Sequence, residues 1–259
     1  MNPVLGTDVT EAFRSCGIAP GTTLMLHSDA IVAAQFAGDL PAEKRLDLLI
    51  EAVLAAIGSQ GTLIMPTFTY SFTRDESFDP ATSPSMVGAV TEHFRRRPGV
   101  QRSENPLFSV AAFGPLAPTF GDTAIGDCFG PGSAFDLLLH KDGVIACLGC
   151  ALDRVTFVHY VEQSRKVGYR YVKRFTGAVV RRGQLEPASV DYLVRDLARE
   201  TSTDLTRLAR RLRETGRLRS AAIGRFGLTV VTARDFFDAA SELLATDPSA
   251  LIREGMRAA

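Results

Sequence analysis

Residues 23–65 read TLMLHSDAIVAAQFAGDLPAEKRLDLLIEAVLAAIGSQGTLIM, and this stretch decides the fold. It begins and ends with short apolar runs, at residues 23–27 and 61–65. Each run is bounded by turn residues, as is typical of a buried strand. Between them, apolar residues recur at helical spacing over about 41–57, and Gly58 ends the pattern. A strand, a helix and a second strand in this order predict an α/β layered sheet.

The same alternation continues along the chain. Further strands are predicted at residues 109–113, 143–148 and 227–231, and further helices at residues 86–97 and 232–244. The first of these helices has a start signal in Ser83-Pro84-Ser85 and a stop signal in Pro98-Gly99. Strands that alternate with helices over this length favour one α/β domain.

The character of the sequence changes past Tyr169. Residues 171–186, YVKRFTGAVVRRGQLE, predict a β-hairpin that turns at Arg182-Gly183. The charged segment 191–219 predicts one or two surface helices. We therefore expect a single domain, residues 1–259, with an elaboration over residues 168–220 that shapes the acceptor site.

Composition excludes several classes of function. The 259 residues are 46% hydrophobic and 22% charged, and Lys+Arg equal Asp+Glu at 29 each. A balanced charge gives no general attraction to nucleic acid or to anionic membranes. No secretory signal and no apolar run of about 20 residues are present. We expect a cytoplasmic protein with a small-molecule substrate, and the sequence leaves a homodimer open.

The four cysteines include one close pair, Cys147-Leu-Gly-Cys150. A C-x-x-C motif can indicate redox chemistry or metal binding. This one closes a strand-like run, and no second pair completes a set of four ligands. We expect reduced, buried thiols and no metal.

Two histidines stand in patterns that suit catalysis. His159 and Glu162 share one helical face at i,i+3 spacing, where a carboxylate can orient an imidazole that acts as general base. His27 ends a predicted strand, and open α/β sheets bind ligands just beyond the carboxyl ends of their strands. From sequence position alone, each of the two histidines could instead have a purely structural role.

Nucleophilic chemistry is the competing hypothesis. Ser28 and Cys150 could serve as nucleophiles of a hydrolase, but the sequence contains no G-x-S-x-G motif. It also contains no phosphate-binding G-x-x-x-x-G-K-[ST] motif.

Several blocks together resemble the aminoglycoside 3-N-acetyltransferase family. They are Leu26-His27-Ser28, the run 61–70 (GTLIMPTFTY), Phe78-Asp79-Pro80, residues 83–88 (SPSMVG), residues 94–100 (FRRRPGV), Arg102-Ser103, residues 109–115 (SVAAFGP), residues 130–133 (GPGS), and the helix from Thr156 through His159 to Glu162. Each block is weak by itself, but the ordered series covers roughly residues 8–190.

The resemblance implies a layered α/β/α fold with a central mixed sheet. It also implies transfer of an acetyl group from acetyl-CoA to an amine by direct attack, without an acyl-enzyme. The residues it assigns to catalysis are His159 as general base, with Asp191 or Glu162 as the carboxylate that orients it. The residues it assigns to acetyl-CoA binding are His27, Ser28, Pro66, Thr67, Ser85 and Ser109.

The sequence departs from the family pattern around the acceptor. Glu104-Asn105-Pro106 replaces the usual His-Pro, no tryptophan is present, and basic residues cluster between Arg165 and Arg182. A polycationic aminoglycoside needs a pocket lined with carboxylates. We therefore expect an amino sugar or a nucleotide-linked amine as acceptor. The alternatives are an aminoglycoside 3-N-acetyltransferase that confers antibiotic resistance, a serine or cysteine hydrolase, and a non-catalytic coenzyme A-binding module.

Overall fold

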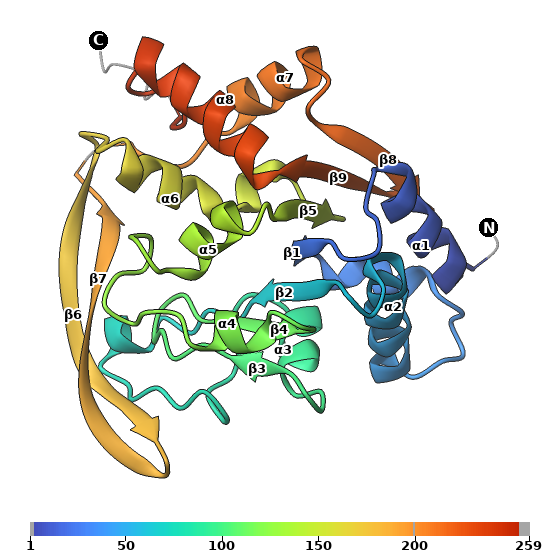
Figure 1. The fold of residues 1–259 in the computed structure, drawn as a ribbon, viewed down its shortest axis with the longest axis horizontal. Coiled ribbons are helices and arrows are strands. Elements are labelled where there is room, and N and C mark those ends of the chain that lie inside the picture. The colour runs from blue at the N-terminus through green and yellow to red at the C-terminus, as the bar shows by residue number, and fades with distance from the viewer. Residues whose placement is uncertain (1–2, 199, 254–259) are drawn as a thin grey trace.

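A seven-stranded mixed sheet forms the centre of the protein (Figure 1). The computed structural model describes residues 3–198 and 200–253. In spatial order the strands are β3 (Gln101–Arg102), β4 (Val110–Phe113), β2 (Thr62–Pro66), β1 (Thr23–Ser28), β5 (Val144–Leu148), β9 (Phe226–Thr232) and β8 (Arg219–Ile223). The three central strands, β2, β1 and β5, are parallel, and the outer strands pair antiparallel. The predicted mixed sheet is confirmed.

Helices cover both faces of this sheet. One face carries α1 (Gly6–Ser15), α2 (Ala42–Ile57) and α3 (Ala89–Arg95), and the other carries α4 (Ala117–Gly121), α5 (Ala134–His140), α6 (Phe157–Ser164), α7 (Thr206–Glu214) and α8 (Ala233–Thr246). Three short 3-10 helices, Ala30–Gln35, Ser71–Arg74 and Leu152–Arg154, lie in the connections. The result is the expected α/β/α layering.

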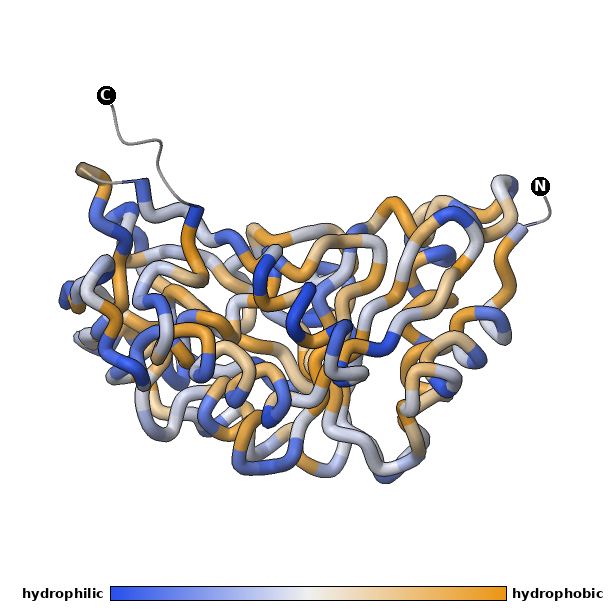
Figure 2. The backbone as a smooth tube through the Cα atoms, turned by 90° about the horizontal axis from the view of Figure 1, so that it is seen from above, coloured by the Kyte–Doolittle hydropathy of each residue, from blue (hydrophilic) through white to orange (hydrophobic). Residues whose placement is uncertain are grey.

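Strand β1 shows how the sequence pattern produces these layers. Successive side chains of a strand point to opposite faces of the sheet. Met25 accordingly packs into the cluster beneath α5, α6 and α8, whereas Leu24 and Leu26 pack into the cluster beneath α1 and α2. Hydrophobic stretches run through the middle of the molecule (Figure 2). Within the described residues, no helix is long and apolar enough to span a membrane.

The predicted hairpin is present and stands at one end of the molecule, apart from the main sheet (Figure 1). Its strands are β6 (Arg170–Arg181) and β7 (Gln184–Arg195). Arg182 and Gly183 form the turn with φ values of 51° and 76°, the left-handed conformation that two-residue hairpin turns require. Buried Val179, Val190 and Leu193 attach the hairpin to the core.

The structure refines the predictions at three places. Segment 191–219 contains one helix, α7, within the predicted one or two, but its first residues complete β7. Strand β8 escapes prediction because it is an edge strand with exposed polar residues such as Arg219 and Ser220. The helix predicted at residues 86–97 spans only α3, because Gly88 with φ 133° precedes it in an extended turn.

Candidate active site

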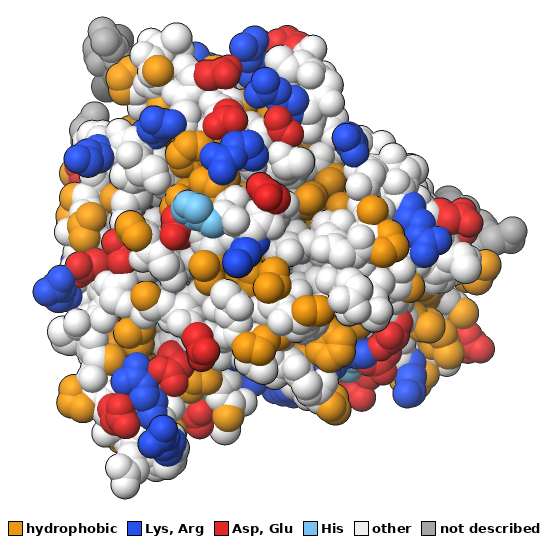
Figure 3. Space-filling model, viewed as in Figure 1, with side chains coloured by type: hydrophobic (Ala, Val, Ile, Leu, Met, Phe, Trp, Pro, Cys, Tyr) orange, Lys and Arg blue, Asp and Glu red, His pale blue; other side chains and the backbone are white. Residues whose placement is uncertain are grey.

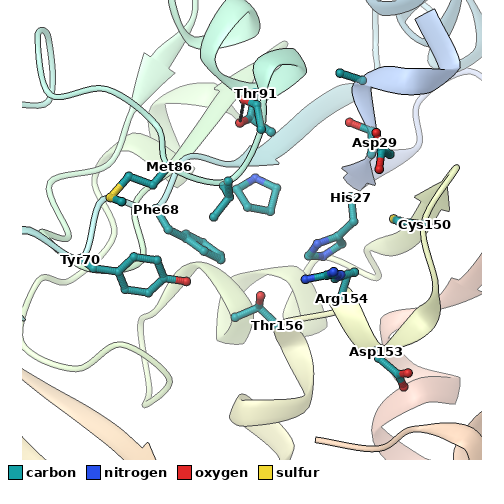
Figure 4. Close-up of a pocket in the computed structure, with 15 residues that line it drawn as sticks. His27, Asp29, Phe68, Tyr70, Met86, Thr91, Cys150, Asp153, Arg154 and Thr156 are labelled. Carbon is teal, nitrogen blue, oxygen red and sulfur yellow. Dashed lines mark hydrogen bonds between the residues drawn. The ribbon is translucent and has the colours of Figure 1, made fainter. Parts of the chain in front are cut away.

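A cavity with a volume of about 560 Å³ opens at the carboxyl ends of the three parallel strands (Figure 4). It is lined by His27, Ser28, Asp29, Ala30, Pro66, Phe68, Tyr70, Met86, Val87, Gly88, Thr91, Cys150, Asp153, Arg154 and Thr156. These residues come from the ends of β1 and β2, the loops after β2 and β5, and the start of α3 and α6. This is the edge at which an open α/β sheet binds its ligand.

Two polar side chains in this cavity have no partner within the described chain. They are His27, whose Nε2 is buried, and Ser28, whose Oγ is buried. Burial lowers the pKa of His27 to about 4, so its imidazole is neutral at physiological pH. Figure 4 shows the His27 side chain projecting into the cavity. Buried polar atoms normally have hydrogen-bond partners, and a polar ligand in the cavity would supply them.

The other residues predicted to bind acetyl-CoA lie either at the cavity wall or in the interior behind it. Pro66 lines the cavity. Thr67 and Ser109 are fully buried and bond to each other, with Ser109 Oγ donating to the Thr67 carbonyl over 2.8 Å. Arg102 Nε donates to both hydroxyls, at 3.1 and 3.2 Å. Their polar groups therefore fasten the end of β2 to β4.

Ser85 is one residue removed from the cavity wall. Its hydroxyl lies 2.9 Å from Thr91 Oγ1, and Thr91 lines the cavity. The structure thus brings His27, Ser28 and Pro66 together at the cavity and places Ser85 behind Thr91.

His159 and Glu162 form a hydrogen-bonded pair on α6. His159 Nδ1 lies 2.6 Å from Glu162 Oε2, and the Glu162 carboxylate is completely buried. Burial by itself would raise the pKa of Glu162. The contacts with His159, Arg170 and Tyr169 outweigh burial and hold this pKa below its ordinary value. Glu162 is therefore ionised and accepts the Nδ1 proton, which leaves the lone pair of the neutral imidazole on Nε2.

Two residues beyond α6 complete the surroundings of Glu162. Tyr169 Oη donates to Glu162 Oε1 over 2.9 Å, and Arg170 Nε forms an ion pair with Oε2 at 2.7 Å. The Tyr169 contact and the ion pair compensate for burial of a charge that would otherwise be costly. Sequence reasoning missed both residues, because Arg170 reads as one member of a basic ribbon.

The His159 side chain does not line the cavity, but two sets of contacts connect it to residues that do. Thr156, whose carbonyl accepts from the His159 N–H over 3.0 Å, lines the cavity. An aromatic wall makes the second connection, because the Phe129 ring lies 5.3 Å from the imidazole and 4.7 Å from Phe108. Phe108 in turn packs 5.4 Å from the cavity residue Tyr70. The imidazole retains 19% exposure.

Asp191 occupies a different position from the one expected of an orienting carboxylate. Arg174, its cross-strand neighbour, donates to both Asp191 oxygens over 2.7 Å. The Asp191 backbone bonds to Gly126 and Cys128, next to Phe129. In the described residues the carboxylate on His159 is Glu162. Asp191 instead attaches the hairpin to the loop that carries Phe129.

Three of the six basic residues of the hairpin form ion pairs. Arg170 binds Glu162, Arg174 binds Asp191, and Arg181 binds both Glu104 and Glu186. Figure 3 shows acidic and basic side chains interspersed over this face of the molecule. These ion pairs weaken the expectation of a positively charged acceptor site. In the described part of the chain, no group of three or more His, Cys, Asp or Glu residues could hold a metal ion.

Comparison with known proteins points to one family. The family profile described as aminoglycoside 3-N-acetyltransferase matches residues 25–245. The chain is 34% identical to aminoglycoside N(3)-acetyltransferase IV from Salmonella sp. over 235 residues, which are 90% of this chain and 84% of the relative. It is 28% identical to aminoglycoside N(3)-acetyltransferase VII from Streptomyces paromomycinus over 180 residues, 62% of this chain and 60% of the relative.

Solved structures agree with these sequence relatives. The aminoglycoside acetyltransferase AAC(3)-IVa apoenzyme superimposes with a TM-score of 0.80 at 28% identity, covering 96% of this chain and 91% of that one. A mutant of AAC(3)-IVa in complex with a gentamicin gives a TM-score of 0.78 at 29% identity, with the same coverage. AAC-IIIb in binary complex with CoASH shares the fold, with a TM-score of 0.79 at 20% identity and coverage of 93% and 96%.

Proposed function

Because the chain belongs to the aminoglycoside 3-N-acetyltransferase family and is a coenzyme A-dependent N-acyltransferase, we propose that it transfers an acetyl group from acetyl-CoA to the 3-amino group of an aminoglycoside. The proposal rests above all on the His159–Glu162 pair beside the strand-end cavity. Family membership favours this function over the two alternatives from other classes, a hydrolase that uses Ser28 or Cys150 and a non-catalytic coenzyme A-binding module.

The donor is proposed to bind in the strand-end cavity. His27 Nε2 and Ser28 Oγ offer polar contacts there, and Pro66 and Phe68 offer apolar contacts to a pantetheine arm. A cavity of about 560 Å³ suits the arm and thioester of acetyl-CoA, while the nucleotide would extend outside it. Thr67, Ser85 and Ser109 support this wall from behind.

His159 is proposed to act as the general base. Attack on the thioester carbonyl needs an amine lone pair, and the amine must lose a proton as the new C–N bond forms. His159 Nε2 is free to accept that proton because Nδ1 donates to Glu162. The buried Glu162 carboxylate stabilises the imidazolium that results. The tetrahedral intermediate then collapses to an amide and expels the coenzyme A thiolate, which takes up the proton held by the imidazolium and leaves as the thiol.

An aminoglycoside acceptor is favoured over a nucleotide-linked amine for two reasons. The relatives are named for aminoglycosides, and a homologous structure contains a gentamicin. Three of the hairpin arginines that suggested an anionic acceptor, Arg170, Arg174 and Arg181, are paired with carboxylates. Asp127, which accepts a hydrogen bond from Gln163 on α6, places a further negative charge beside this helix, which suits a polycation.

The test is release of free thiol from acetyl-CoA across a panel of acceptors. The panel contains gentamicin, apramycin, glucosamine and a nucleotide-linked amino sugar. We expect saturable thiol release with at least one aminoglycoside and little release with the other amines. More efficient turnover of the nucleotide-linked amine would contradict the aminoglycoside assignment and leave the acyltransferase assignment standing.

A further inference from the structure

The C-x-x-C pair lies at the wall of the strand-end cavity. Cys147 is the fourth residue of β5 and is 1% exposed, whereas Cys150 follows the end of β5 and is partly exposed. Cys150 lines the strand-end cavity and also a second cavity beside α7. The expectation that both thiols are buried therefore holds for Cys147 and fails for Cys150.

Cys147 and Cys150 are close enough for each to shift the pKa of the other. Gly149, with φ 71°, lies between them in the left-handed conformation and turns the chain after Leu148. A Cβ at this position would lie 2.3 Å from Val32 Cγ2, so the turn is closely packed as well as left-handed. The fold thus fixes the turn that separates the two cysteines.

The pKa values of the two thiols are shifted in opposite directions, and thiol–disulfide exchange needs one thiol that ionises readily. Contact with Cys147 lowers the pKa of Cys150, more than burial raises it. The Cys147 pKa is raised well above its ordinary value, first by the contact with Cys150 and then by burial. The attacking group in thiol–disulfide exchange is a thiolate. Cys150 lines the cavity and is partly exposed, whereas Cys147 is buried behind it. A disulfide in the cavity can therefore reach Cys150 first, which makes Cys150 the attacking thiol and Cys147 the thiol that resolves the product.

We propose that Cys150 and Cys147 form a thiol–disulfide exchange site whose substrate is a low-molecular-weight disulfide of the coenzyme A class. The choice of coenzyme A rests on the proposed function, since the same cavity is assigned to acetyl-CoA. The Cys150 thiolate attacks one sulfur of the disulfide, forms a mixed disulfide and releases one coenzyme A thiolate. Cys147 then attacks the Cys150 sulfur, loses its proton and releases the second coenzyme A thiol. The cysteine pair is oxidised by two electrons, and the small disulfide is reduced.

The test is mass spectrometry of the folded protein after incubation with coenzyme A disulfide, followed by peptide mapping. We expect the wild-type protein to lose two hydrogen atoms and to gain a Cys147–Cys150 bond. Cys147→Ala should instead accumulate a coenzyme A adduct on Cys150, and Cys150→Ala should show neither product. Cys16 and Cys128, which are buried, serve as internal controls and should remain reduced.

In a second experiment, oxidised glutathione replaces coenzyme A disulfide at the same concentration. We expect it to oxidise the pair about tenfold or more slowly, because the exchange itself is chemically similar and only binding differs. Equal rates would overturn the assignment to the coenzyme A class. Reaction of Cys150 no faster than Cys16 or Cys128 would overturn the exchange site. Acetyl transfer by the reduced enzyme is measured separately, so its absence would count against the proposed function and not against the exchange site.

Discussion

His159 Nδ1 and Glu162 Oε2 lie 2.6 Å apart within a single helix, α6. The i,i+3 spacing places both side chains on one face, and Glu162 is completely buried while His159 keeps contact with solvent. The helix thus leaves Nε2 of the imidazole free, while Glu162 holds Nδ1. The carboxylate, in turn, is fixed by Tyr169 and Arg170 at the start of the hairpin.

The first prediction concerns this carboxylate. Glu162→Gln should lower kcat by about 10²–10⁴-fold, because a neutral amide neither fixes the tautomer of His159 nor stabilises the imidazolium. The same substitution leaves Arg170 buried without its charge partner, so the free energy of unfolding should fall by about 3–5 kcal/mol. Steady-state kinetics and denaturant unfolding measure the two effects.

Asp191→Asn is the matched control for Glu162→Gln. Asp191 pairs with Arg174, whose side chain is 67% exposed, so the amide should change kcat by less than about threefold. A larger loss from Asp191→Asn than from Glu162→Gln would reverse the assignment of the orienting carboxylate.

The second prediction uses the acid dependence of stability. The folded-state pKa of Glu162 lies below its ordinary value of 4.5. The unfolded chain therefore binds more protons than the folded chain just below pH 4.5, and stability is lost as the pH falls through the folded pKa. The free energy of unfolding of Glu162→Gln should decline less steeply below pH 4.5 than that of the wild type. Parallel curves for the two proteins would show that Glu162 is not held ionised.

The third prediction concerns His27. Its pKa of about 4 in the folded protein lies below the ordinary value of 6.5. The unfolded chain binds more protons between these values, so stability is complete above pH 6.5 and falls as the pH is lowered towards 4. This loss should reach about 3 kcal/mol. It should be absent from His27→Asn, measured by urea unfolding at pH 7.0 and 4.5. An equal loss in both proteins would mean that His27 is not buried as a neutral imidazole.

The sequence predicts the parts of this fold that depend on local pattern. Residues 23–27 and 61–65 are apolar runs between turn signals, and they form β1 and β2 within one residue of the predicted bounds. Arg182-Gly183 is a hairpin turn by composition alone, and it turns as predicted. Edge strand β8 escapes prediction because half-exposed edge residues show no alternation of apolar and polar side chains.

The site is predicted less completely, because its contacts join distant segments. Glu162 is three residues from His159, so spacing suffices to pair them. Nothing in the sequence shows that Arg170 turns inward to Glu162 while Arg174 turns outward to Asp191. Thr67 and Ser109 follow family blocks, yet they bond to each other because β2 and β4 pair at that point. Side-chain direction in the folded sheet decides these roles.

The most direct test of the proposed mechanism is the single substitution His159→Ala, measured with acetyl-CoA and gentamicin. If His159 Nε2 takes the proton from the attacking amine, kcat should fall by about 10²–10⁴-fold. The dissociation constant for coenzyme A, measured by calorimetry, should stay within about twofold, because the donor cavity does not include this side chain. Turnover close to that of the wild type, with gentamicin still acetylated, would contradict the claim that His159 is the general base.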